Sequence, residues 1–386
     1  MQTFTFKVRT LLVLVMLLCG LSSRAADDLI TQQITINVAE AGTLPAKIGT
    51  AKRSQITNLK LTGELNSADV VVLRTMTDSN QGGHLENLDL EEVKIVEGGS
   101  YYYGYGTQND VLTDYFFESS NCLKNLKLPA GLKAIGNFAL SHCTNLQNIS
   151  IPEGVASIGY QAFENCTNLE SVNIPKGVTT IRRYTFAYCS QLTEVSIPAS
   201  VNIIDVSAFR GCESLNSVIL PDGLSEVYDE TFYGCSSLKN VQFPKDLTRI
   251  GRDAFSGCKG LTEIDVPSSV TTIENNAFEG CSGLSKIYVH WITPIETGTN
   301  VFKGCDSENG TLYVPKGTYQ DYWLSEFAYF KNIVEYDATG INQVSTSANA
   351  KPLSRHSVNG QRLTSPTKGL NIVKYSDGSV RKEMVK

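Results

Sequence analysis

Apolar side chains recur with a period of 23 residues through the middle of the chain, and such a period indicates a repeat architecture. The unit reads L-x-x-V-x-I-P-x-x-V-x-x-I-x-x-x-A-F-x-x-C-x-x. The leucine column is Leu123, Leu146, Leu169, Leu192, Leu215, Leu238, Leu261 and Leu284. The phenylalanine column is Phe163, Phe186, Phe209, Phe232, Phe255 and Phe278. The cysteine column is Cys143, Cys166, Cys189, Cys212, Cys235, Cys258 and Cys281.

The first part of each unit predicts a short strand. In one copy, Val195 and Ile197 alternate with polar residues, which is the pattern of a half-buried strand. Pro198 ends the strand, because proline lacks the N–H that a ladder needs. Further along the same copy, Phe209 and Cys212 lie three residues apart, which suits a short helical or 3-10 turn.

One such coil cannot bury its own apolar residues, whereas stacked coils align each column into a ladder. The leucine, valine and isoleucine positions, followed by A-F-x-x-C, resemble the BspA-like leucine-rich repeats of bacterial surface proteins. The resemblance is specific over 123–305 and looser over 85–122. It implies a mainly β, right-handed leucine-rich-repeat solenoid at 85–305, with strand ladders and short 3-10 or helical turns. It also implies an adhesin or an interaction scaffold.

The segment before the repeats predicts a small α+β cap at 26–84, since a solenoid needs ends that cover its open core. A strand is expected at 34–38 and a helix at 67–76. Ser67 and Asp69 supply N-cap chemistry at the start of this helix.

Three segments of different composition follow the repeats. Residues 306–336 contain an aromatic stretch that predicts a C-terminal cap, and 337–352, rich in small polar residues, predict a linker. Residues 353–386 are basic and predict a small β tail, with hairpin dipeptides at Asn359-Gly360 and Asp377-Gly378. The tail resembles the C-terminal sorting modules of proteins secreted by the type IX route, although no aromatic residue precedes the first dipeptide. The alternative is a tail domain without a sorting role.

The N-terminal segment 1–25 predicts a cleaved secretory signal peptide. Lys7 and Arg9 precede the apolar run 11–18, which is too short to span a bilayer, and Ala25 precedes the expected cleavage site. Loss of the segment's three basic residues changes the net charge from −6 to −9, which argues against a nucleic-acid partner. We expect an exported monomer without a transmembrane segment, located at the cell surface, outside the cell or in the periplasm of a Gram-negative bacterium.

The cysteines raise the question of disulfides, because the chain is predicted to be exported. The Cβ bonds of a column point the same way, so the pattern favours a packing ladder of buried thiols over disulfides. A linear ladder also does not converge on a zinc ion. Cys122 and Cys305 lie at irregular coils and stay candidates for oxidation. Cys19 follows a leucine rather than a small residue, which favours soluble export over a lipoprotein.

Catalytic chemistry is not indicated by any motif. The sequence contains no G-x-S-x-G, P-loop or H-E-x-x-H pattern. Its four histidines lie in four different parts of the chain: His84, His142, His290 and His356. We therefore predict no enzymatic activity, no metal site and no cofactor.

The strongest candidate for a functional site is the polar face of the predicted strands. The second and fourth positions after each leading leucine flank an inward residue and point outward. The predicted ligand-binding residues on this face are Asn125, Lys127, Asn148, Ser150, Ser171, Asn173, Glu194, Ser196, Gln242 and Glu263. The family resemblance favours a host matrix or cell-surface protein as the partner. The alternative is a structural envelope protein whose face is polar only for solubility.

A second candidate site is an insertion in the first coil, rich in glycine and tyrosine. Tyrosine offers amphipathic contact area at a low cost in side-chain entropy. The predicted binding residues are Tyr101, Tyr102, Tyr103 and Tyr105, and the ligand is a protein or a glycan. The alternative is a loop folded over the cap with its rings buried.

Overall fold

The structure, a computed structural model, describes residues 29–337 and, in the tail, residues 352–357, 362–363, 365, 369–375 and 380–385. The described residues form two compact units, one of 29–314 with 318–334 and one of 315–317 with 335–337 and the described tail residues. The predicted signal peptide and most of the predicted linker lie outside the described residues, so the domain boundaries stay predictions.

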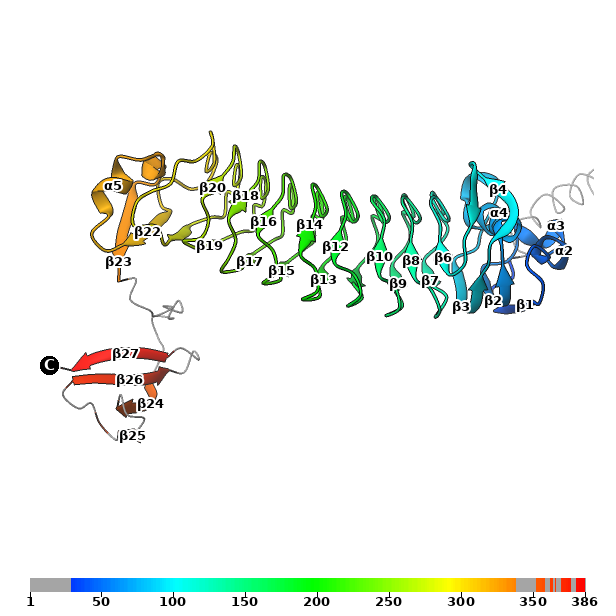
Figure 1. The fold of residues 1–386 in the computed structure, drawn as a ribbon, viewed down its shortest axis with the longest axis horizontal. Helices are drawn as coiled ribbons and strands as arrows, with labels where there is room; N and C mark the ends of the chain where they lie inside the picture. Colours follow the sequence, from blue (N-terminus) through cyan, green and yellow to red (C-terminus); the bar gives the residue numbers. More distant parts are fainter. Residues whose placement is uncertain are drawn as a thin grey trace, which may run out of the picture. The chain divides into compact units, whose positions relative to one another are not determined.

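Each repeat is a coil with two short strands, and the coils stack in a row (Figure 1). The first ladder comprises β7 (Asn125–Lys127), β9 (Asn148–Ser150), β11 (Ser171–Asn173), β13 (Glu194–Ser196), β15 (Ser217–Ile219), β17 (Asn240–Gln242), β19 (Glu263–Val266) and β21 (Lys286–Val289). The second ladder comprises β8 (Ala134–Ile135), β10 (Ser157–Ile158), β12 (Thr180–Ile181), β14 (Ile203–Ile204), β16 (Glu226–Val227), β18 (Arg249–Ile250) and β20 (Thr272–Ile273). The mainly β solenoid predicted from the repeat is confirmed.

The pairing register equals the sequence period. Where strands of successive coils pair, they pair in parallel, so that Val172 lies opposite Val195 in the first ladder and Ile181 opposite Ile204 in the second. The pairing is interrupted at several steps, such as β9 to β11, where the neighbouring strands are still in contact. Identical positions therefore stack on one another, and the apolar columns form one continuous core.

The third side of each coil consists of turns closed by bonds between residues three apart, such as Cys212 N–H to Phe209 O. No helix forms here in the described coils, because the residue two before each phenylalanine has a left-handed φ, as Ser207 does at 57°. A left-handed residue interrupts a right-handed helix. The predicted short turns are therefore single 3-10-type turns.

The phenylalanine column is a stack of parallel rings inside the solenoid. Phe186, Phe209 and Phe232 are fully buried, with ring centroids 5.5 and 5.6 Å apart and interplanar angles of 9° and 1°. The stack continues to Phe302 at the C-terminal end. Six phenylalanines of this column are among the largest fully buried side chains of the described residues.

The cysteine column is buried, reduced and hydrogen-bonded. Cys212 Sγ donates to the carbonyl oxygen of Phe186 at 3.2 Å, and every other column cysteine makes the equivalent bond, to Phe or, from Cys166, to Leu140. All nine cysteines of the described residues, including Cys122 and Cys305, are free. The thiol thus supplies a donor to a buried carbonyl as well as apolar volume.

We expect the column thiols to resist alkylation in the folded protein. Burial raises the pKa of Cys235 to about 12, and burial likewise raises the pKa of Cys212, so the reactive thiolate is suppressed. Iodoacetamide at mildly alkaline pH, followed by mass spectrometry, should modify at most the half-buried Cys122 in the native chain. All nine should react in concentrated guanidinium chloride. Rapid labelling of the native column would contradict the packing.

The N-terminal unit extends the first ladder. Its strands β1 (Ile34–Val38), β2 (Asn58–Leu65) and β3 (Asn87–Ile95) form one sheet with β7 and β9 in the order β1-β2-β3-β7-β9. The helices are α2 (Leu44–Lys47), α3 (Thr50–Arg53), α4 (Ser67–Thr77) and η1 (Ser79–Gln81). The N-cap of α4 is Asn66 rather than Ser67, and Asp69 completes a capping box with it.

The insertion in the first coil forms a hairpin of β4 (Gly98–Tyr102) and β5 (Tyr105–Thr107), followed by β6 (Val111–Leu112). Ser67 Oγ accepts a hydrogen bond from Thr107 N at 2.8 Å, which ties the hairpin to the start of α4.

Beyond the last coil, β22 (Thr311–Pro315) and β23 (Asn332–Tyr336) extend the sheet in the order β19-β21-β22-β23. Between them, α5 (Tyr319–Trp323) and η2 (Glu326–Tyr329) place aromatic rings over the core. The buried rings of Phe327 and Phe330 contact Phe302 at centroid distances of 5.9 and 5.2 Å.

The tail is an antiparallel sheet in the order β25-β24-β26-β27. Its strands are β24 (Pro352–Ser357), β25 (Arg362–Leu363), β26 (Gly369–Tyr375) and β27 (Val380–Val385). The predicted hairpin dipeptides lie outside the described residues.

Candidate functional site

The ten predicted strand-face residues lie on one face of the first ladder. They belong to β7, β9, β11, β13, β17 and β19, and nine are exposed while Glu263 is half-buried. The residue between each pair points inward, as Val172 does with 4% of its surface exposed. Alternation within each strand and parallel register between strands together produce this face.

The two ends of this face are occupied by contacts within the chain. At the N-terminal end, Asn125 Nδ2 donates to Asn87 Oδ1 at 2.7 Å, and Asn148 Nδ2 donates to Asn125 Oδ1 at 3.2 Å. Lys127 pairs with Asp89 at 3.1 Å. These side chains already use part of their hydrogen-bonding capacity.

At the C-terminal end, the rings of Tyr288 and Tyr313 stack with centroids 4.3 Å apart. Burial, and then the charge of Glu263, raise the pKa of Tyr288 to about 12, so its hydroxyl stays protonated. The sequence-based prediction missed Tyr313, although its alternation with Leu312 and Val314 indicates an outward position.

The central section, on β11 to β17, differs from both ends. In the described part of the chain, its outward side chains make no hydrogen bond or ion pair; they are Ser171, Asn173, Glu194, Ser196, Ser217, Asn240 and Gln242. Ile219, with 72% of its surface exposed, lies among them. The central section therefore offers donors, acceptors and one apolar side chain to a ligand.

The tyrosine hairpin presents some of its rings and buries one. Tyr101, Tyr103 and Tyr105 are 75%, 69% and 38% exposed. Tyr102 is buried: its hydroxyl bonds Thr113 at 2.6 Å, and burial raises its pKa to about 12. The Tyr102 ring packs in the core, as in the alternative of a buried ring, whereas the other three tyrosines keep exposed surface.

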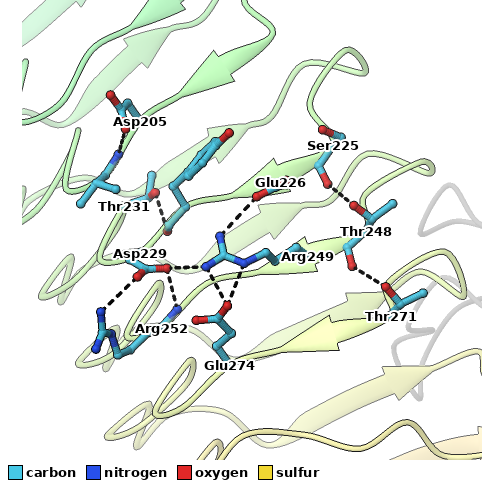
Figure 2. Close-up of polar contacts among 12 residues, drawn as sticks. Asp205, Ser225, Glu226, Asp229, Thr231, Thr248, Arg249, Arg252, Thr271 and Glu274 are labelled. Carbon is cyan, nitrogen blue, oxygen red and sulfur yellow. Dashed lines mark hydrogen bonds and ion pairs between the residues drawn. The ribbon is translucent and has the colours of Figure 1, made fainter.

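The second ladder carries a charged network that is internally satisfied (Figure 2). Arg249 bonds Asp229 at 2.7 Å, Glu274 at 2.9 Å and Glu226 at 3.3 Å, and Arg252 also pairs with Asp229. Burial opposes the charge of Arg249, but the bonds to Glu274 and Asp229 raise its pKa. This network joins successive coils and leaves little unpaired charge for a ligand.

The described residues show no group of histidine, cysteine and acidic side chains placed to hold a metal ion. His84 Nδ1 bonds Ser54 O, His142 Nδ1 bonds Ser141 Oγ, and His290 Nε2 bonds Asp265. No described helix has the length and apolar character needed to cross a membrane.

Stacked coils with an apolar interior and an open strand face define a leucine-rich-repeat solenoid. The family model of the BspA type leucine rich repeat region matches six copies, over residues 110–239 and 202–320. These matches cover more than half of the chain, and the chain belongs to this family.

Solved structures of bacterial leucine-rich-repeat proteins are similar. The T. pallidum leucine-rich repeat protein is 32% identical, with 39% of this chain and 71% of that chain covered and a TM-score of 0.38. A Bacteroides ovatus leucine-rich repeat protein is 22% identical, with 79% and 92% covered and a TM-score of 0.34. A leucine rich cell surface protein of Faecalibacterium prausnitzii is 19% identical, with 63% and 86% covered and a TM-score of 0.22. No curated protein matches the chain.

Proposed function

We propose that this chain is an exported, non-enzymatic adhesion or interaction protein that binds a protein partner through its first-ladder strand face. The observation that carries the proposal is the central section, whose polar side chains have no partner in the described structure. Unpaired polar groups around the exposed Ile219 match the mixture of apolar contact and polar rim found in protein interfaces. Membership in a family of bacterial surface proteins supports the same conclusion.

The test is binding of the full secreted chain to an array of extracellular-matrix and cell-surface proteins. The variant Asn173→Arg/Ser196→Arg changes two side chains that lie opposite each other in the register. It should weaken binding at least about tenfold, because each arginine adds bulk and a charge without a complementary partner.

The matched control is Ser157→Arg/Ile203→Arg, which adds the same charge to exposed positions of the second ladder. It should bind like the wild-type chain. Equal losses in both variants, or no binding to any array protein, would overturn the proposed function.

Exposed Tyr101 and Tyr103 support a second candidate, a glycan-binding hairpin. Binding to a glycan array that is lost in Tyr101→Ala/Tyr103→Ala and kept in the strand-face variant would favour this function instead.

A further inference from the structure

Two arginines on the second-ladder side differ from all others in the described solenoid and caps. Residues 29–337 contain seven arginines. Five have carboxylate or backbone carbonyl partners, namely Arg53, Arg74, Arg210, Arg249 and Arg252. Within the described residues, the guanidinium groups of Arg182 and Arg183 have no hydrogen-bond or ion-pair partner, and both side chains are exposed. Arg183 lies over the ring of Tyr184 at 5.3 Å.

The two arginines line an open hollow of about 440 Å³ that spans three successive coils. It lies where β10, β12 and β14 end, and its lining residues are Tyr160, Gln161, Arg182, Arg183, Tyr184 and Asp205. Gly159 occupies the position that Arg182 has in the next coil, and a Cβ there would lie 2.5 Å from Asn137 N. The previous coil therefore has no side chain beside Arg182 at this position.

Arg183 also differs from the residues at its position in the other coils. In four of them the equivalent residue is Asp or Asn and accepts a hydrogen bond from a backbone N–H of the next coil: Asp114, Asn137, Asp229 and Asn275. In three others it is Tyr160, Val206 or Arg252. An arginine side chain cannot accept a hydrogen bond. Arg252, the arginine at the same position in a later coil, pairs with Asp229 of the neighbouring coil, whereas Arg183 has no such partner in the described residues. This difference supports a role for Arg183 in contacting something outside the coil.

A row of aromatic rings leads from the tyrosine hairpin to this hollow. Tyr105 contacts Tyr115 with centroids 5.1 Å apart, Tyr115 stacks on Phe138 at 4.8 Å, and Phe138 meets Tyr160 at 5.1 Å. All four rings are partly or largely exposed. The row thus gives an extended, partly apolar track that ends at two unpaired positive charges.

We propose that this track binds an acidic oligosaccharide, with Arg182 and Arg183 holding its carboxylate or sulfate group. A guanidinium matches the planar geometry of such anions with two parallel hydrogen bonds. The aromatic row contacts the neutral sugar units that precede the anion. The site lies on the turn side of the solenoid and is independent of the first-ladder strand face.

A saccharide fits the hollow better than a peptide strand does, because the coil backbone there is already paired. Gln161 N–H donates to Arg183 O at 3.1 Å, and Tyr184 N–H donates to Val206 O at 3.3 Å. A peptide that adds to a sheet needs free backbone groups. Recognition here must come from side chains, and the side chains offer rings and two cations.

The test is calorimetric titration of the full chain with three hexasaccharides: hyaluronan (carboxylate), chondroitin sulfate (carboxylate and sulfate) and neutral chitohexaose. We expect binding of one or both acidic sugars, and which of them binds identifies the anion. Arg182→Gln/Arg183→Gln should lower the affinity about 10- to 100-fold. The affinity of Arg182→Lys/Arg183→Lys should lie between those of the wild-type chain and the glutamine variant. Lysine keeps the positive charge but lacks the planar guanidinium that forms two parallel hydrogen bonds.

Arg252→Gln/Lys259→Gln, two exposed positions in a later coil, is the charge-matched control and should bind like wild type. Tyr160→Ser should weaken oligosaccharide binding several-fold with an unchanged melting midpoint. The proposal is overturned by equal binding of chitohexaose, by absence of binding to both acidic sugars, or by equal losses in the control. Tighter binding of a hexaglutamate peptide or a single-stranded oligonucleotide at the same arginines would overturn the saccharide assignment.

Discussion

Phe209→Ala is expected to lower the free energy of unfolding by about 3–5 kcal/mol. Phe209 is fully buried and stacks on a ring on each side, so its removal opens a cavity between two pairs of coils. In a solenoid each coil is stabilised by its neighbours, and the cavity weakens both interfaces at once. Urea denaturation followed by circular dichroism measures the loss.

The control for this change is Phe243→Ala, which removes the same ring from a half-buried position in contact with Phe255. The decrease in the free energy of unfolding should be clearly smaller for Phe243→Ala than for Phe209→Ala. Equal midpoints for the wild-type and Phe209→Ala chains would show that the assigned coil register is wrong.

Gly63→Ala is expected to destabilise the N-terminal unit by about 2–5 kcal/mol, combining left-handed strain with overpacking. Gly63 has a φ of 92° in β2, and a Cβ there would lie 2.2 Å from the carbonyl oxygen of Val38 in the paired strand β1. The two strands must separate to accept the methyl group. Thermal unfolding of the full chain should show an earlier transition.

Gly82→Ala separates the backbone strain from the overpacking, because Gly82 has a φ of 76° but open space where a Cβ would lie. This change should lower the free energy of unfolding only by the left-handed backbone strain, about 1–2 kcal/mol. If the two variants lose the same stability, the close approach of β1 and β2 at Gly63 is not present in solution.

The repeat made the solenoid predictable, because 23-residue spacing fixes which residues stack and hence which face the core. What the sequence pattern missed depends on local backbone geometry. Ser207 adopts a left-handed φ that no apolar pattern indicates, and this selects single 3-10-type turns from the two expected forms, a short helical turn or a 3-10 turn. Similarly, Asn66 rather than Ser67 caps α4, since the choice depends on which side chain reaches the amide of Ala68.

The outward positions of the strand face were predictable from alternation alone, but their state of pairing was not. Asn125 and Asn240 occupy equivalent sequence positions on the face, yet of these two only Asn125 bonds a neighbouring side chain in the described residues, because Asn87 lies beside it. The burial of Tyr102 was not predictable for a similar reason: within a run of tyrosines, composition does not show which ring turns inward. The unpaired Arg182 and Arg183 became notable only when the partners of the other arginines were known.

The most direct test of the claim that a protein partner binds the first-ladder strand face is site-specific cross-linking. It is practicable because the native thiols of the cysteine column are buried. In a Cys122→Ser background, the variant Asn173→Cys places an exposed thiol on the strand face that can be labelled selectively with a photo-cross-linker, and Ile203→Cys on the second ladder is its counterpart. Each labelled chain is irradiated with the matrix or cell-surface protein that the wild-type chain retains. Covalent capture from Asn173→Cys and not from Ile203→Cys is the predicted result. Capture from Ile203→Cys alone would contradict the assignment of the partner to the strand face.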